Sequence, residues 1–193
     1  DLGTVGFASH DVDDFFRPLG SVTAMVKGSY SMECYYQSLD EAFADHASRA
    51  GIAGEELLAS TDFVMLHTPF RNMPELAMRR LLAARLGFDE TKSTEWLRDR
   101  GFFEAVDTIA QTGNAYSASL YLVLAQALRE RYAKLGKDIV GKRFLLASYG
   151  SGNVMIVVGG RVAAGAPAQI ESWGKATLPL PGRSASMAEY DRW

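Results

Sequence analysis

The sequence predicts an α/β fold in which helices and strands alternate without a division into two domains. Several long stretches carry apolar residues at helical spacing, and short apolar runs of the length of buried strands stand between them. The chain has 193 residues, of which 48% are hydrophobic and 22% charged, as in ordinary globular proteins. At roughly 150 residues per domain, this length predicts about one domain.

The N-terminal part predicts a loop and then a helix. Residues 10–18 are acidic and aromatic, and Pro18 is typical of a loop. A helix is predicted over 29–48, with Ser31 as its cap because a hydroxyl can accept from the free N–H groups of the first turn. Its apolar face consists of Tyr35, Leu39, Ala42 and Phe43.

Next comes a short buried strand, predicted from the four apolar residues Phe63–Leu66. Pro69 disfavours helical backbone at Thr68, so His67 is expected where the strand passes into a loop. Further helices are predicted over 75–86, 91–110 (one or two) and 117–132. Two strands over 143–147 and 153–158 are expected to flank a glycine-rich turn, 148–152.

Charge and cysteine content exclude several classes of protein. With 20 Lys+Arg against 23 Asp+Glu, the net charge of -3 argues against a nucleic-acid-binding domain. Cys34 is the sole cysteine, which excludes an intramolecular disulfide and fits a cytoplasmic location. No apolar run reaches the ~20 residues of a membrane span. The first residues lack the features of a signal peptide, and the missing Met is expected of a processed or excised end.

His67 is the first candidate for chemistry. A histidine held at the end of a buried strand suits acid–base work or stabilisation of a developing oxyanion. Two further segments are 113–117, where Asn114 can orient a carbonyl ligand, and 148–152, where glycines expose backbone N–H groups. Taken one at a time, a core histidine is an equally valid interpretation of His67, whereas a helix-capping Asn and a plain β-turn are the favoured interpretations of the other two segments.

The other reactive side chains receive no role. Cys34 lies on the apolar helix and is interpreted as a small buried hydrophobe. His10 and His46 are expected in solvated segments, and the acidic run Asp11, Asp13 and Asp14 in a solvated loop. With three His and one Cys, no metal site is predicted.

Several segments in order resemble the C-terminal half of the 3-hydroxy-3-methylglutaryl-CoA synthase family. They are the segments 14–18 and 28–35, then His67-Thr68-Pro69-Phe70, Gly113-Asn114 with Tyr116, and Ser148-Tyr149-Gly150-Ser151-Gly152. The similarity runs from about Asp11 to Gly152, and more weakly to Tyr190. Each motif alone is weak, but their common order is not expected by chance.

The resemblance implies a thiolase-like fold, with layered helices and a mixed sheet of the five-stranded type. Residues 1–193 would form one C-terminal domain of a two-half condensing enzyme, which joins an acetyl group to an acetoacetyl thioester. By this resemblance, His67 is catalytic and contacts the acceptor carbonyl or thioester oxygen. The residues implied to line the acyl-thioester pocket are Asn114, Ser151, Tyr116, Pro69 and Phe70.

The family's nucleophilic Cys and general-base Glu lie in the N-terminal half, which this chain lacks; Cys34 matches a helix position instead. The chain is therefore interpreted either as a fragment or as one subunit of a split enzyme. In both cases the resemblance implies activity only with the complementary half, in a dimeric assembly of halves. No cofactor is implied beyond the thioester substrates, and neither nucleic acid nor membrane is an expected partner.

The acceptor carrier is left open between CoA and an acyl carrier protein. Two family lysine positions that meet CoA phosphates fall on Asn72 and Leu76, and Arg71 offers partial compensation. Relatives in polyketide pathways perform the same condensation on carrier-protein thioesters and install β-branches. A third alternative is a non-catalytic subunit that binds acyl thioesters or stabilises a partner.

Overall fold

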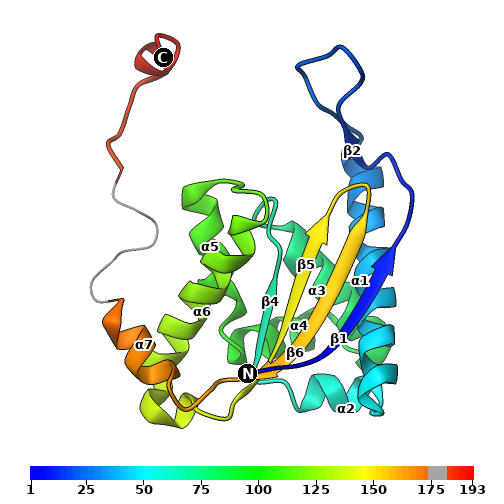
Figure 1. Ribbon diagram of the computed structural model, residues 1–193, viewed down its shortest axis with the longest axis vertical. Helices are drawn as coiled ribbons and strands as arrows, with labels where there is room; N and C mark the ends of the chain where they lie inside the picture. Colours follow the sequence, from blue (N-terminus) through cyan, green and yellow to red (C-terminus); the bar gives the residue numbers. More distant parts are fainter. Residues whose placement is uncertain (174–181) are drawn as a thin grey trace.

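The computed structural model describes residues 1–173 and 182–193. A four-stranded mixed sheet, in the order β1-β6-β5-β4, forms its centre. The strands are β1 (Leu2–Ser9), β4 (Phe63–Leu66), β5 (Arg143–Gly150) and β6 (Val154–Arg161), with a separate two-stranded hairpin of β2 (Phe15–Phe16) and β3 (Met25–Val26). β4 runs parallel to β5, whereas β6 is antiparallel to both of its neighbours. Figure 1 shows the β2–β3 hairpin projecting beyond one end of the sheet.

The helices predicted over 29–48, 75–86, 91–110 and 117–132 are confirmed with shifted ends. They are α1 (Gly28–Ala50), α3 (Met73–Leu86), the pair α4 (Glu90–Asp99) and α5 (Phe102–Thr112), and α6 (Ala118–Leu135). Three helices were not predicted, namely α2 (Gly54–Ala59), α7 (Ala166–Ser172) and α8 (Met187–Tyr190), and a 3-10 turn covers Gly136–Ile139. The expected cap Ser31 is wrong. Lys27 is the residue at the N-cap and makes no side-chain capping bond, while Ser31 is buried inside the first turn.

The strand predictions are confirmed at Phe63–Leu66 and for the strand–turn–strand unit. β5 extends to Gly150, however, so the turn is shorter than 148–152. β1 and the β2–β3 hairpin were not predicted, because their apolar residues alternate with Gly, Ser and Thr or stand alone. Among the described residues the main sheet has four strands, one fewer than the five-stranded type that the resemblance implied. Part of the C-terminal tail, 174–181, lies outside the described residues.

Helix α1 packs closely on β1 and β6 because glycine removes side chains at the contact. A Cβ on Gly6 would lie 2.2 Å from the backbone N of His46 and 2.5 Å from the carbonyl O of Ala42. The larger apolar cluster fills this interface and includes Tyr35, Leu39, Phe43, Leu66, Leu82, Leu97 and Met155. This tight layer fixes α1 relative to the strand ends.

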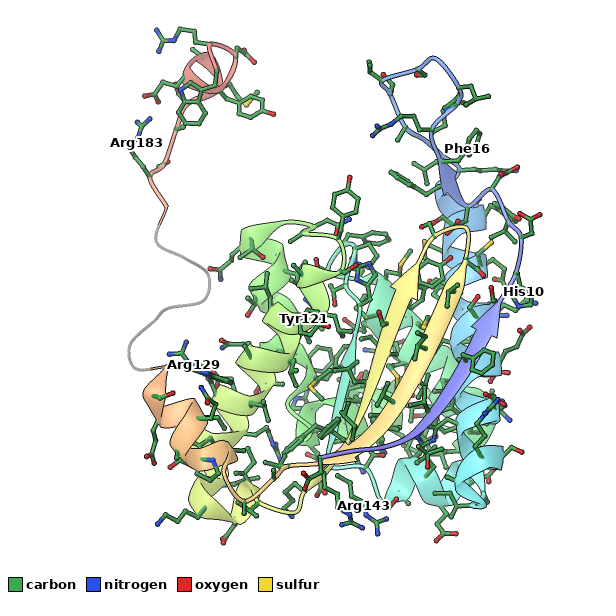
Figure 2. The ribbon with its side chains drawn as sticks, in the orientation of Figure 1. His10, Phe16, Tyr121, Arg129, Arg143 and Arg183 are labelled. Atoms are coloured by element: carbon green, nitrogen blue, oxygen red, sulfur yellow. The ribbon has the colours of Figure 1, made fainter. Side chains whose placement is uncertain are left out.

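The two faces of the sheet are covered unequally. Figure 1 shows α1, α3 and α4 behind the sheet, while α5 and α6 lie beside β4. On the other face, β1 and β6 expose apolar side chains: Val5 (43%), Phe7 (54%), Val154 (43%) and Ile156 (37%). Tyr121 on α6 is also exposed and lies near this side of the sheet (Figure 2). Within the described residues, this part of the sheet is left without a covering layer.

Among residues 1–173 and 182–193, no helix is both long and apolar enough to span a membrane.

Candidate active site

A cleft of about 450 Å³ opens where β4 and β5 end beside the β2–β3 hairpin. Parallel neighbouring strands bring their carboxyl ends to the same edge of a sheet, which is where α/β proteins commonly bind ligands. The structure brings all six predicted site residues to this cleft: His67, Pro69, Phe70, Asn114, Tyr116 and Ser151. They come from three segments far apart in the sequence, so local structure alone does not bring them together.

The backbone of His67 is held from both sides. Its N–H donates to the carbonyl of Ala147 on β5 at 2.7 Å, which continues the parallel pairing one residue past β4. Its carbonyl accepts from the buried Tyr35 hydroxyl at 2.8 Å. The Thr68 hydroxyl donates to the carbonyl of Leu66 at 2.9 Å and fixes the start of the loop. These bonds hold the backbone at the end of β4 and so place the imidazole in the cleft, as the sequence predicted.

The environment of His67 favours the neutral ring. The side chain is 7% exposed, and desolvation by burial lowers its pKa below the ordinary value of 6.5. Its Nδ1 is buried and has no hydrogen-bond partner. A neutral imidazole carries one donor and one acceptor nitrogen, so it can bind a carbonyl oxygen and also move a proton.

Asn114 and Tyr116 form one wall. The Oδ1 of Asn114 accepts from the backbone N of Tyr116 at 2.8 Å, which makes an Asx turn rather than a helix cap. Tyr116 has φ 53°, a left-handed conformation that costs a non-glycine residue roughly 1–2 kcal/mol. With Oδ1 assigned to this turn, the Asn114 amide can donate its NH₂ group to a ligand in the cleft. The helix α6 begins just beyond, at Ala118.

The turn that carries Ser151 is anchored by a buried acid. The carboxylate of Asp14 is fully buried and accepts from the Tyr149 hydroxyl at 2.6 Å and from the Gly152 N–H at 2.8 Å. The Asn153 amide donates to the same tyrosine oxygen at 3.2 Å and to the Ser38 hydroxyl at 3.0 Å. The expectation that Asp14 lies in a solvated loop is wrong. The loop folds back because Asp14 satisfies the donors of the β5–β6 turn.

Sequence reasoning missed several lining residues. Tyr149 lines the cleft, and its pKa is raised by burial and by its hydrogen bond to Asp14. A signal existed, because Leu145, Ala147 and Tyr149 alternate along β5 and all face the core. Four further apolar residues line the cleft: Phe15, Val26, Met32 and Met73. The first two come from the unpredicted hairpin. Met32 lies in the helix predicted over 29–48, and Met73 lies just before the helix predicted over 75–86.

The residues that received no role divide into three cases. Cys34 is buried and does not line the cleft, as expected for a structural thiol. His10 is half-buried and its Nε2 lies 2.6 Å from the Glu41 carboxylate. His46 was expected in a solvated segment, and that is wrong, because it is 3% exposed beneath the sheet. Its spacing from Leu39, Ala42 and Phe43 already placed it on the buried face of α1.

Arg71, at the rim of the cleft, is already engaged by acids. Its guanidinium contacts Asp107 at 2.5 Å and Glu75 at 2.8 Å. Arg71 is therefore a poor substitute for the two family lysines, whose positions hold Asn72 and Leu76. Lys27 stands between the lining residues Val26 and Gly28 and is another cation beside the opening.

Known proteins resemble this chain in sequence. Residues 6–100 match the family model for the hydroxymethylglutaryl-coenzyme A synthase C terminal. The hydroxymethylglutaryl-CoA synthase of Enterococcus faecalis is 29% identical over 183 residues, which covers 95% of this chain and 44% of the relative. The Haloferax volcanii synthase is 29% identical over 184 residues, covering 76% of this chain and 40% of the relative.

Solved structures give the same picture. MvaS in complex with 3-hydroxy-3-methylglutaryl coenzyme A superimposes with a TM-score of 0.80 at 28% identity, covering 100% of this chain and 49% of that one. The HMG synthase of the curacin biosynthetic pathway shares the fold, with a TM-score of 0.85 at 24% identity, covering 100% of this chain and 45% of that one. The expected thiolase-like half is confirmed. The chain spans less than half the length of these relatives.

Proposed function

We propose a condensing function for this chain, which matches the C-terminal half of hydroxymethylglutaryl-CoA synthases in sequence and fold. The chain would supply one wall of a synthase that joins an acetyl group to an acetoacetyl thioester. One observation carries this proposal: six residues chosen from separate sequence motifs surround a single cleft at the strand ends. A complementary N-terminal half would supply the nucleophilic Cys and the general-base Glu.

The cleft residues suit the acceptor side of this reaction. When the acetyl carbon attacks the β-keto carbon, the ketone oxygen gains negative charge and then a proton. The neutral His67 ring can donate a hydrogen bond to that oxygen, and the Asn114 NH₂ group can orient the thioester carbonyl. The apolar walls, among them Phe70 and Met73, would shield the reacting carbons from water.

The surfaces left uncovered support a complementary half. The outer face of β1 and β6 exposes Val5, Phe7, Val154 and Ile156, and the β2–β3 hairpin exposes Leu19 (104%) and Val22 (93%). Apolar surface of this extent is typical of an interface with another polypeptide. The hairpin also lines the cleft through Phe15 and Val26, so a partner covering it would help to close the site.

A carrier-protein-dependent synthase that installs polyketide β-branches is the second candidate, and the side chains at the two family lysine positions favour it. Asn72 and Leu76 carry no positive charge, and the Arg71 guanidinium is neutralised by Asp107 and Glu75. A phosphopantetheine arm needs fewer phosphate contacts than free CoA. Lys27 beside the opening is the feature that favours CoA.

The non-catalytic alternative is a subunit that binds an acyl thioester or stabilises its partner. A subunit of this kind would not need an imidazole, an amide and a strained tyrosine in the same cleft, so their presence together argues against it. Strain of this kind is commonly retained at functional sites.

The deciding experiment measures turnover of this chain reconstituted with an N-terminal half. We expect His67→Ala to lower kcat by about 10²- to 10⁴-fold, the usual contribution of a positioned acid–base group. Cys34→Ala is the matched control, because this thiol is buried outside the cleft, and its turnover should equal that of the parent. An unchanged rate for His67→Ala would leave the non-catalytic subunit as the better interpretation.

The acceptor is identified by comparing kcat/KM for acetoacetyl-CoA and for an acetoacetyl carrier protein. If the chain serves a carrier protein, the double variant Asn72→Lys and Leu76→Lys should raise kcat/KM for the CoA substrate by about tenfold or more, since charge-assisted bonds to phosphate are strong. If the parent enzyme already prefers acetoacetyl-CoA and the two lysines do not raise kcat/KM, the proposal of a carrier-protein acceptor is contradicted.

A further inference from the structure

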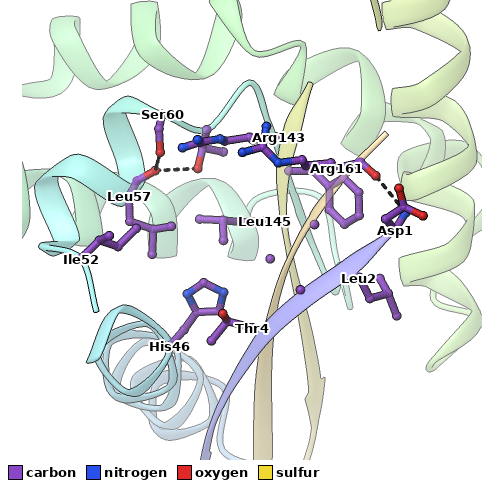
Figure 3. Close-up of a pocket in the computed structure, with 15 residues that line it drawn as sticks. Asp1, Leu2, Thr4, His46, Ile52, Leu57, Ser60, Arg143, Leu145 and Arg161 are labelled. Atoms are coloured by element: carbon purple, nitrogen blue, oxygen red, sulfur yellow. Dashed lines mark hydrogen bonds between the residues drawn. The ribbon is translucent and has the colours of Figure 1, made fainter. Parts of the chain in front are cut away.

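A second cleft, of about 360 Å³, lies at the opposite end of the sheet from His67. Its lining includes His46 on α1, Leu145 and Arg143 on β5, and Gly159 and Arg161 on β6. Figure 3 shows these groups around one opening, with the His46 ring pointing into it. Figure 2 places Arg143 at the end of the sheet away from the hairpin residue Phe16. This cleft has no part in the condensation described above.

Two guanidinium groups stand side by side at its outer end. Arg143 and Arg161 are paired directly across the antiparallel strands β5 and β6, so their side chains project from the same face of the sheet. Like charges directly opposite each other destabilise a sheet. In the part of the chain that the structure describes, neither guanidinium forms an ion pair with a carboxylate.

Neither acid near the pair forms an ion pair with it among the described residues. The Asp62 carboxylate accepts from the backbone N of Arg143 at 2.8 Å and lies 3.4 Å from Lys142 Nζ. Asp1 also lines the cleft, where its backbone nitrogen donates to the carbonyl of Arg161 at 2.9 Å. The guanidinium of Arg161 makes one long bond, 3.4 Å, to the carbonyl of Gly141. The pair therefore presents donors whose charge is not compensated by carboxylates.

The inner end of the cleft offers a buried imidazole. His46 is 3% exposed, and neither ring nitrogen makes a well-formed hydrogen bond. The ring lies over Gly159, where a Cβ would come within 2.6 Å of Nε2. Gly159 is two residues from Arg161 on the same face, so the backbone positions beneath the imidazole and at Arg161 are separated by roughly 7 Å along the strand. The absent side chain at Gly159 gives the ring its place on the cleft floor.

We propose that this cleft binds a small organic anion. Its phosphate or carboxylate group would bridge the guanidiniums of Arg143 and Arg161, and a hydrogen-bonding group at its other end would meet His46. An oxyanion removes the repulsion between the two arginines and gives each fork-shaped donor a partner. The site is separate from the His67 cleft, and the proposal of an anion site does not depend on the proposed condensation.

The test is thermal unfolding of the purified chain with inorganic phosphate, glycerol 3-phosphate or succinate, each against sodium chloride at equal ionic strength. A ligand that binds the folded chain alone should raise Tm by several degrees at about 100 times its dissociation constant. We expect phosphate to raise Tm above the chloride baseline, and glycerol 3-phosphate to bind more tightly because its hydroxyl reaches toward His46. A larger effect of succinate would identify the anion as a carboxylate.

Variants separate this site from general charge effects. Arg161→Gln should abolish the phosphate shift while leaving Tm without ligand equal or higher, because a like-charge contact is lost; Arg143→Gln provides the second variant. Lys92→Gln on α4 is matched in charge and should keep the full shift. His46→Gln should keep the phosphate shift and change the advantage of glycerol 3-phosphate. Equal shifts with chloride and with the anions, or equal loss in Lys92→Gln and Arg161→Gln, would overturn the proposal.

Discussion

His67 and His46 lie at opposite ends of the same sheet and have much in common. Both are buried, both have ring nitrogens without hydrogen-bond partners, and burial lowers the pKa of each. They differ in what surrounds them. His67 closes a strand and faces Asn114 and Ser151 across an apolar cleft, whereas His46 lies on a helix over a glycine and near two arginines. Burial alone therefore does not identify a catalytic group; the groups that converge on it do.

The two ends are also supported differently. At the His67 end, Asp14, Tyr149 and Asn153 form a connected hydrogen-bond network that fixes the β5–β6 turn. At the His46 end, Arg143 and Arg161 face each other without carboxylate partners. A satisfied buried network gives one end a single arrangement. The other end keeps a charge imbalance that a ligand can neutralise.

The largest stability effect that we expect at the His67 end comes from Asp14→Asn. The amide keeps one acceptor oxygen and loses the charge that binds both the Tyr149 hydroxyl and the Gly152 N–H. Hydrogen bonds to charged groups contribute about 1.5–3 kcal/mol, so the free energy of unfolding should fall by about that amount. Urea unfolding measures it, with the exposed neighbour Asp13→Asn as control. Equal stability of the two variants would show that the network does not hold this end together.

The matching test at the His46 end is Gly159→Ala. The new Cβ would lie 2.6 Å from Nε2 and 3.1 Å from Cε1 of His46, so the ring must move. Overpacking of this kind costs about 1–3 kcal/mol. Gly150→Ala, at the other end of the β5–β6 hairpin, is the control because no atom lies within 4 Å of its new Cβ. A Gly159→Ala protein as stable as the Gly150→Ala protein would mean that His46 moves freely.

The buried histidines at both ends of the sheet should make the stability of the protein depend on pH. Both histidines have a folded-state pKa below the ordinary 6.5, so below that pH the unfolded chain binds protons that the folded chain rejects. The free energy of unfolding should therefore fall as pH drops through about 6.5, and be regained above it. For His46, an interaction with the Thr4 backbone and, more weakly, the charge of Asp45 oppose this lowering of the pKa.

Single variants divide this dependence between the two sites. His67→Gln and His46→Gln should each flatten the slope of stability against pH, measured by urea unfolding at stepped pH. The double variant should flatten it further by the sum, because sites this far apart are independent. A slope that neither variant changes would assign the dependence to other groups.

The sequence predicted much of the helical fold, and the reasons for its failures are physical. Periodicity located α1, α3 and α6 because long amphipathic helices repeat the same signal several times. It missed β1, where the sequence Leu2–Ser9 alternates apolar residues with Gly, Thr and Ser and its outward side carries Val5 and Phe7. The inward residues Gly6 and Ala8 are small, so the alternation in this strand does not mark its buried face.

The candidate site was predicted for a different reason. His67, Asn114 and Ser151 carry weak signals separately, and their common order suggested the family whose fold brings them together. Asp14 was missed because its partners, Tyr149 and Gly152, are more than 130 residues away, as the hydrogen bonds show. Burial of a lone acid in a polar loop has no local sequence signature.

The smallest effect that we expect concerns Tyr116, whose left-handed backbone is held by Asn114. Asn tolerates this conformation better than Tyr, so Tyr116→Asn should raise the free energy of unfolding by up to about 1 kcal/mol. Because Tyr116 is 70% exposed, its loss costs little packing. The ring lines the cleft, so the same variant should raise KM for the acceptor thioester. Tyr116→Phe, which keeps the ring and the strain, should change neither quantity much. If Tyr116→Asn gains stability while KM stays constant, the strained backbone does not serve binding of the acceptor thioester. The His67 cleft would then differ less from the anion cleft than we infer.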